Sequence, residues 1–321
     1  MKKALCFLII LFNLTMLINA KKLAKLTDIL EAAYITVSND KIFISGDNSI
    51  HIYSSKDMKL IKKIGRKGNG PEEFQYSPKI RIYNEKLYAY SLNKLSIIDT
   101  NGKFLTENRL KGFWNFKIAP IKDNFVLLHF SMMKKNKKIK NALVVSLCNN
   151  KIEEIKTLYS SPENSGKKIN IVPETIDFDI WNNKIFIADS HKGLYIIVLN
   201  DKGEKLKEFK NPYKKIKISE SYKKERIDKF KKNMPKGIKF NISCPDYFPP
   251  FHKFYIFDGH LYFKTYEKKG DKILFRIFDT KGKELKKIYL PDQNIFTFNN
   301  NSYYYLKRDE NDDWELYSVK I

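Results

Sequence analysis

The side chains best suited to chemistry in this sequence are isolated histidines and carboxylates. Imidazole and carboxylate groups transfer protons and bind metal ions. We therefore consider His129, Asp189, His191 and His252 as candidates for acid–base chemistry, and Asp47, Asp189 and His191 as candidates for a metal site. A divalent cation such as Ca²⁺ is the one cofactor that such a site suggests, although nothing in the sequence requires it. We favour the simpler interpretation, that each of these groups is a solvated loop residue.

A second set of residues is suited to binding. Only six of the sixty basic residues are arginines, and an arginine offers a rigid fork to a carboxylate or a phosphate. Arg66 lies in a glycine-rich segment, and Arg81 lies in a strand that we expect to be innermost, beside a central channel. Tyr247 and Phe248 belong to an aromatic cluster beside a basic surface. These four residues are our candidates for ligand binding, with structural ion pairs and loop packing as the alternatives.

The charge of the chain is strongly positive. Lys and Arg total 60 against 36 Asp and Glu, which gives a net charge of +24. The lysines are spread over the whole sequence, so we favour a solvated surface produced by compositional drift over a selected anionic partner. Weak attraction to anionic surfaces follows from the charge, but specific nucleic-acid binding is not expected. The 43% hydrophobic content excludes a disordered chain.

The first twenty residues are typical of an export signal. Lys2 and Lys3 precede an apolar stretch that ends near Ala20, a plausible cleavage point. We therefore expect an exported protein, periplasmic or extracellular, that begins at residue 21; an uncleaved membrane anchor is the alternative. Cys148 and Cys244 then remain, and an oxidising compartment leaves a disulfide between them open.

A repeated unit organises the rest of the sequence. Each copy has a turn with Asn, Asp or Gly, an apolar-aromatic strand, a second alternating strand, a hairpin and a third strand. Four clear copies begin at Asn39, Asn84, Asn182 and Asp258, and two weaker copies cover residues 116–158 and 295–321. The hairpin is nearly the same at residues 99–103, 200–204 and 279–283, each with a glycine.

Six such copies predict one domain over residues 21–321. Four-stranded units repeated at roughly 40 to 50 residues are typical of an all-β, six-bladed β-propeller with antiparallel blades. The last copy lacks a strand, and the segment Leu23 to Leu30 has no other place, so we expect this N-terminal strand to close the ring. Residues 219–235 interrupt the repeat, and we expect a short surface helix there that is capped by Ser219.

One segment carries a family resemblance. Ile64-Gly65-Arg66-Lys67-Gly68-Asn69-Gly70-Pro71-Glu72-Glu73-Phe74 resembles the linker between blades in NHL-repeat-like propellers, and more closely the exported six-bladed β-propeller proteins of bacteria. Glu72 stands where that family usually has Gly. The resemblance implies the propeller fold, and it implies functions that range from lactone hydrolases and peptide lyases to pure binding domains. Phe74 is expected to plug between two sheets.

From these observations we favour a non-catalytic binding or scaffold module. It would recognise a protein, peptide or glycan on one face of the propeller and act as a monomer. The alternative is a metal-assisted hydrolase or lyase, lactonase-like or peptide-lyase-like, with its site at the mouth of the central channel. The sequence leaves the identity of the ligand open.

Overall fold

The computed structural model describes residues 20–38, 40–110, 114–135, 138–162, 168–234 and 241–321. The expected export signal lies almost wholly outside these residues. In the part of the chain that is described, no helix is both long and apolar enough to cross a membrane.

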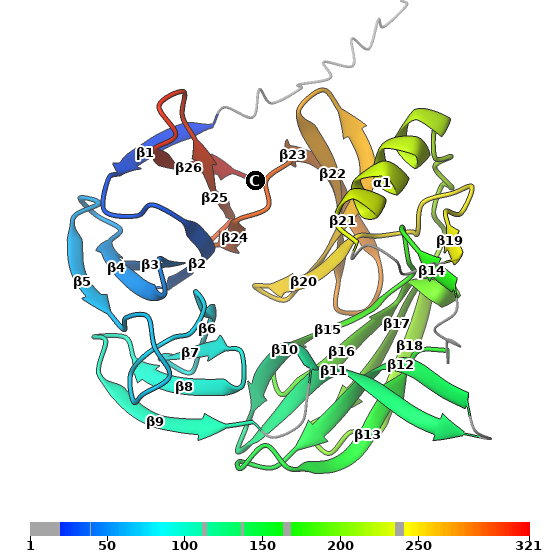
Figure 1. Cartoon of the computed structure of the whole chain (residues 1–321), viewed down its shortest axis with the longest axis horizontal. Helices are drawn as coiled ribbons and strands as arrows, with labels where there is room; N and C mark the ends of the chain where they lie inside the picture. The colour runs from blue at the N-terminus through cyan, green and yellow to red at the C-terminus, as the bar shows by residue number, and fades with distance from the viewer. Residues whose placement is uncertain (1–19, 39, 111–113, 136–137, 163–167, 235–240) are drawn as a thin grey trace, which may run out of the picture.

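Six four-stranded antiparallel sheets are arranged as blades around a centre, as the sequence predicted (Figure 1). Blade 1 contains β2 (Ala32–Ser38), β3 (Lys41–Gly46), β4 (Ser49–Ser54) and β5 (Leu60–Ile64). Blade 2 contains β6 (Lys79–Tyr83), β7 (Lys86–Ser91), β8 (Lys94–Asp99) and β9 (Phe104–Arg109). Blade 3 contains β10 (Trp114–Ile121), β11 (Asn124–Lys135), β12 (Lys138–Cys148) and β13 (Glu154–Ser160).

The remaining blades follow the same order from the centre outward. Blade 4 contains β15 (Ile176–Trp181), β16 (Lys184–Asp189), β17 (Leu194–Asn200) and β18 (Lys205–Asn211). Blade 5 contains β20 (Lys253–Phe257), β21 (His260–Lys269), β22 (Lys272–Asp279) and β23 (Glu284–Pro291). Blade 6 contains β24 (Phe296–Asn299), β25 (Ser302–Arg308), β26 (Trp314–Lys320) and β1 (Lys21–Leu26).

The N-terminal strand closes the ring, as predicted. Strand β1 pairs antiparallel with β26, from Lys21 opposite Ser318 to Leu26 opposite Trp314. Leu26 is buried between blades 6 and 1, in one cluster with Leu306 and Leu316. A strand borrowed from the other end of the chain therefore completes the last blade and covers its open edge.

Polar side chains fix the repeated hairpins. The Asp99 carboxylate accepts hydrogen bonds from the amides of Asn101 and Lys103, at 2.9 and 2.8 Å. Asn200 and Asp279 make the same pair of contacts in their own blades. The glycine that follows has a positive φ in all three turns, which explains the nearly constant sequence.

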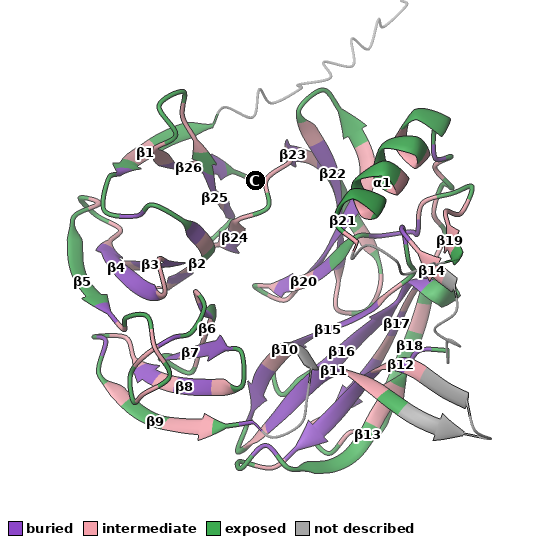
Figure 2. Ribbon diagram, viewed as in Figure 1, coloured by how far each residue is buried: buried purple, intermediate pink, exposed green. Residues whose placement is uncertain are grey.

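The core lies between neighbouring blades (Figure 2). Buried residues are concentrated on the second and third strands of each blade, whereas the outermost strand is largely exposed. Phe74 is fully buried between blades 1 and 2, which confirms its predicted role as a plug. Glu72 has a φ of 58°, so the turn keeps the left-handed conformation that a glycine would adopt more readily.

An insertion lies between blades 4 and 5. The predicted helix is present as α1 (Glu220–Lys232), and the Ser219 side chain caps it by accepting from the Tyr222 amide. Two short parallel strands, β14 (Lys168–Asn170) and β19 (Asn241–Ser243), lie beside it. Ile171, Val172 and Ile218 form a small buried cluster beneath the helix. A single-turn helix, η1 (Ser190–Lys192), follows β16.

Both cysteines of the described chain are free thiols. Cys148 is buried, and burial, assisted by the Glu154 charge, raises the pKa of its thiol to about 12. The disulfide that the sequence left open is therefore not formed.

Candidate functional site: the linker face and the centre of the ring

The two faces of the ring are built differently. Because strands within a blade alternate in direction, the linkers between blades and the loops from second to third strands lie on the same side, which we term the linker face. Hydrogen bonds join these two kinds of connection. The Asp47 carboxylate accepts from the amides of Leu30 and Glu31, both at 2.9 Å, and the Ser190 hydroxyl accepts from the Thr175 amide. The opposite face carries the tight turns.

Exposed apolar side chains occur on the linker face. Leu30 is 77% exposed and Tyr76 is 60% exposed, both in linkers between blades. Leu92 lies in a loop between second and third strands, and Tyr247 lies in the linker before blade 5; both are also exposed. The turns of the opposite face are mostly polar, with Trp181, 40% exposed at the end of β15, as an exception. The two faces therefore present different chemistry to a partner.

The innermost strands bring charged side chains to the centre of the ring in layers. Successive side chains on one side of a strand are two residues apart, so β6, β15 and β20 each contribute one residue to each of three layers. The upper layer, nearest the linker face, contains Lys79, Asp177 and Lys253, with Lys117 from β10. The middle layer contains Arg81, Asp179 and Tyr255. The lower layer contains Tyr83, Trp181 and Phe257.

An ion pair in the middle layer crosses from blade 2 to blade 4. Arg81 contacts the Asp179 carboxylate, whose side chain is 4% exposed. The other carboxylate oxygen accepts from the Ile256 amide of blade 5 at 2.9 Å. Burial opposes the ionisation of Asp179, but Arg81 and Lys117 outweigh it and lower the pKa of the carboxyl group. Arg81 thus lines the centre, as expected, and the structural role that we kept as an alternative is the one observed.

The upper layer holds more positive than negative charge. Lys117 Nζ donates to Asp177 Oδ1 at 3.0 Å, and the Phe254 amide approaches Oδ2 at 3.4 Å. Lys79 and Lys253 are both exposed. Although solvent reaches Lys79, the protein around it partly buries it, and this burial lowers its pKa. The charges of Lys253 and Lys117 lower the pKa further, while Asp177 opposes them. These lysines therefore lie close enough to repel one another.

His252 adjoins the upper layer. Its side chain is exposed, yet burial, followed by the charges of Lys253 and Lys264, lowers its pKa to about 4. Its ring centroid lies 5.5 Å from that of Tyr266. Water reaches this imidazole while protein surrounds it, as expected at a concave position.

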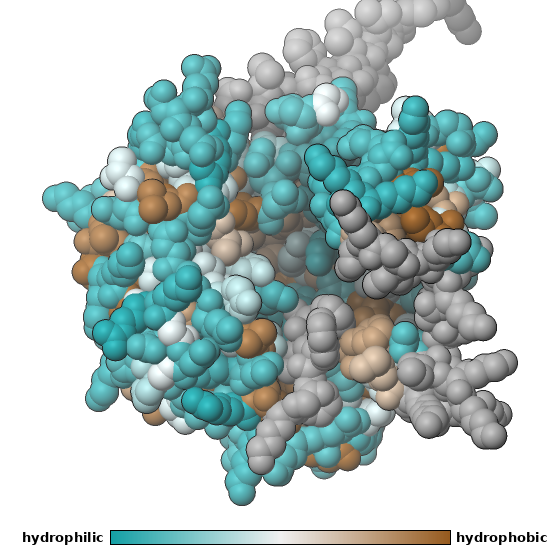
Figure 3. All heavy atoms as spheres, viewed as in Figure 1, coloured by the Kyte–Doolittle hydropathy of each residue, from teal (hydrophilic) through white to brown (hydrophobic). Residues whose placement is uncertain are grey.

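Figure 3 shows one face of the molecule, which is hollowed at its centre and bordered mostly by hydrophilic side chains.

Asp189 and His191 do lie together on the linker face. His191 Nδ1 lies 2.8 Å from Asp189 Oδ1, which also accepts from the His191 amide at 2.9 Å. The Tyr159 hydroxyl donates to Asp189 Oδ2 at 2.6 Å. Burial raises the pKa of Asp189, but these hydrogen bonds outweigh it, so the net shift is downward. Asp189 therefore caps the η1 turn with Oδ1 and joins blade 4 to blade 3 with Oδ2.

The other predicted residues lie apart from this pair. Asp47 holds the entry to blade 1 through backbone amides. His129 is not a loop residue, because it lies within β11, which continues to Lys135 in a long hairpin with β12. His129 is buried within that strand, and its Nε2 lies 2.9 Å from the Ser146 hydroxyl. Within the described ranges, no three His, Cys, Asp or Glu side chains are grouped so as to hold a metal ion.

The candidate binding residues also separate. The Arg66 guanidinium is mostly exposed and pairs with Glu73 at 2.8 Å, within the same linker. Tyr247 is exposed, and Lys215 Nζ lies 5.7 Å from its ring centroid. Phe248 stacks on Tyr266, with centroids 4.5 Å apart. Tyr247 is thus available to a partner, whereas Phe248 packs in the insertion.

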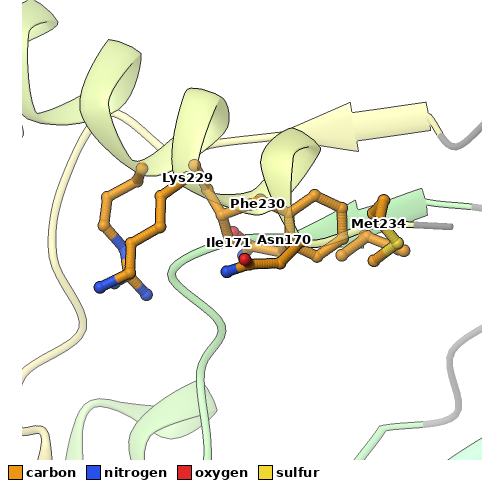
Figure 4. A pocket seen from close by; sticks show the side chains of 8 residues that line it. Asn170, Ile171, Lys229, Phe230 and Met234 are labelled. Atoms are coloured by element: carbon orange, nitrogen blue, oxygen red, sulfur yellow. The ribbon is translucent and has the colours of Figure 1, made fainter. Parts of the chain in front are cut away.

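A cavity of about 380 Å³ lies between α1 and β14 (Figure 4). Arg226 and Lys229 supply positive charge, and Ile171, Phe230 and Met234 supply an apolar wall. Asn170 and Asn233 add amide groups.

The sequence reasoning missed the charged residues of the upper layer. A signal was present, because Asp177 and Asp179 alternate with Phe178 inside a strand, where carboxylates are rare unless they are paired. The lysines gave no comparable signal, since lysine is spread over the whole chain.

One comparison with known proteins bears on the architecture. A family model described as a 6-bladed beta-propeller matches residues 27–179. No curated protein matches the sequence. Among solved structures, a protein of unknown function from Bacteroides caccae is 12% identical, with 81% of this chain and 82% of that chain covered and a TM-score of 0.42.

Two further solved structures are similar to the chain at comparably low identity. The WD40 domain of SCAP from fission yeast is 11% identical, with 94% and 86% of the two chains covered and a TM-score of 0.38. The acylaminoacyl peptidase of Pyrococcus horikoshii is 12% identical, with 90% of this chain but 50% of that chain covered and a TM-score of 0.48. The chain is a six-bladed β-propeller, on the agreement between the family description and the six sheets of the structure.

Proposed function

We propose that this propeller is a binding or scaffold module whose linker face recognises a protein or peptide, with a glycan as the alternative ligand. One observation carries the proposal: the exposed side chains of Leu30, Tyr76, Leu92 and Tyr247 all lie on connections of the linker face. Aromatic and aliphatic side chains of this kind form the centres of protein interfaces. On the opposite face, Trp181 at the end of β15 is 40% exposed, less than any of these four side chains.

Photo-crosslinking tests this assignment of the binding face. A benzophenone amino acid would replace Tyr76 or Tyr247 on the linker face, and Asn183 or Asn301 in turns of the opposite face. Each variant would be irradiated in an extract of the cells that make the protein. We expect one shared adduct at both linker-face positions and little at the other two. Adducts confined to the opposite face, or equal at all four positions, would refute the proposal.

A metal-assisted reaction is the second candidate, and the contact between Asp189 and His191 is the observation that favours it. Both Asp189 oxygens already accept hydrogen bonds, so a metal ion would have to displace the Tyr159 or His191 contact. Elemental analysis after dialysis without chelator separates the candidates. A stoichiometric ion that is lost in Asp189→Asn would support the enzyme.

The proposal includes export and a monomeric state. Cleavage after Ala20 would leave β1 intact, since that strand begins at Lys21. N-terminal sequencing of the protein from its natural source should begin at Lys21. An uncleaved N-terminus would contradict export by this route. Light scattering should give the mass of one chain.

A further inference from the structure

The upper layer has an unbalanced charge in a place that solvent reaches. Three lysines from three different blades, Lys79, Lys117 and Lys253, surround the single carboxylate of Asp177. That carboxylate is itself engaged by Lys117 and by the Phe254 amide. Lys253 forms no side-chain hydrogen bond or ion pair with any other residue in the described ranges. The carboxylate of the next layer, Asp179, is paired with Arg81.

The layers beneath provide a floor. Arg81, Asp179 and the Ile256 amide join blades 2, 4 and 5 in the middle layer. Below them, the Tyr83 hydroxyl donates to Asn183 Oδ1 at 3.2 Å and joins blade 2 to blade 4 again. The centre of the ring is therefore cross-linked below the upper layer, and the upper layer faces the linker side.

We propose that the upper layer binds an anionic group of the ligand, a carboxylate or a phosphate, with Lys79 and Lys253 as its cationic partners and His252 beside them. The inference rests on the proposed function, because the ligand on the linker face would insert this group into the centre of the ring. Each lysine supplies three N–H donors and a full charge, and charge-assisted hydrogen bonds are the stronger ones.

Electrostatics favours occupation of this place. Lysines that are partly surrounded by protein repel one another more strongly than lysines in water. The pKa of Lys79 is lowered first by burial and then by this repulsion from Lys253 and Lys117. An anion held between them would remove it. The lysines of the outer strands are mostly exposed, so they gain much less from an anion.

His252 offers a reporter that lies at the site. The charged groups that act on it are Lys253, Lys264 and Arg226, which lower its pKa, and Asp292, which raises it. An anion bound at Lys253 would offset part of the lysine charge and raise the pKa of His252 above about 4. Anions bound weakly elsewhere on this basic protein would leave that resonance unchanged.

The experiment titrates the full chain with inorganic phosphate and, separately, with citrate, at physiological ionic strength. The His252 resonance is followed by NMR and is assigned with His252→Gln. We expect saturable shifts and a raised His252 pKa, with roughly tenfold weaker binding in Lys79→Gln and in Lys253→Gln. Lys286→Gln, an exposed residue of β23, removes the same charge and should bind as the wild type does. Phosphate and citrate affinities together tell whether phosphate or carboxylate is preferred.

Saturable shifts that need roughly tenfold more anion in both site variants, and are unchanged in Lys286→Gln, would support the proposal. Two results would overturn it: no saturable shift of His252 with either probe, or equal weakening in all three lysine variants. The crosslinking experiment reads the linker face without any anion. If His252 shows no saturable shift but crosslinks form on the linker face, only this inference is refuted. If the titration succeeds but no crosslink forms on the linker face, only the proposed function is refuted.

Discussion

Substitution of Arg81 by Met should destabilise the ring more than loss of any surface ion pair. The change keeps an aliphatic stem but leaves the Asp179 carboxylate, 4% exposed, without its direct cation. Removing one partner of a buried pair costs about 3–5 kcal/mol. Lys117 and the Ile256 amide still stabilise the carboxylate, and Arg81 is 28% exposed, so we expect a loss of about 3 kcal/mol in the free energy of unfolding.

The assay is equilibrium urea denaturation, with Arg66→Met as the matched control. Arg66 is 82% exposed and pairs with Glu73 within one linker, so its loss should leave stability close to that of the wild type. The effect of Arg81→Met should also depend on pH. The lowered pKa of Asp179 stabilises the fold above the ordinary value of 3.8, and this contribution is lost as the pH falls through the folded-state pKa. Equal losses in the two variants would refute the reasoning.

Three further experiments test the closing strand, the linker after blade 1 and the buried thiol of blade 3. Leu26→Ala should lower the free energy of unfolding by about 3 kcal/mol, because this side chain of the closing strand is only 2% exposed. The control Leu30→Ala, at 77% exposed, should change it by about 0.5 kcal/mol or less. Thermal unfolding measures both variants, and equal effects would contradict ring closure by β1. Gly65→Ala should lower the free energy of unfolding by about 2 kcal/mol or more in urea denaturation. The new Cβ would lie 2.4 Å from the Phe74 ring, and residue 65 has a φ of 77°, which alanine adopts poorly. Unchanged stability would exclude this close approach. Cys148 should resist alkylation at mildly alkaline pH until the protein unfolds, as peptide mapping would show, since burial raises its pKa to about 12; rapid labelling would contradict its burial.

Local features of the fold could be predicted from the sequence because their causes are local. The Asp99 hairpin repeats because one side chain satisfies two amides of the same turn. The helix α1 follows from its Ser219 cap, and Phe74 follows from the glycine-rich linker that carries it. Ring closure by β1 was also predictable, because the last copy of the repeat lacked a strand.

The candidate site was less predictable because its contacts join blades that are distant in sequence. Arg81 meets Asp179 only when the ring places β6 opposite β15. The charge of the upper layer likewise depends on three blades at once. Proximity in sequence did identify Asp189 and His191 as neighbours, but it did not show that Asp189 holds its own loop with one oxygen and Tyr159 of blade 3 with the other.

The claim most central to this account is that a ligand meets the linker face over a cationic centre. Crystals of the full chain soaked in selenate would test it directly, since selenium gives an anomalous signal and selenate resembles phosphate in shape and charge. We predict a strong anomalous peak between Lys79 and Lys253, which is lost in Lys253→Gln crystals. Peaks only on the outer strands or among the turns of the opposite face would contradict the account.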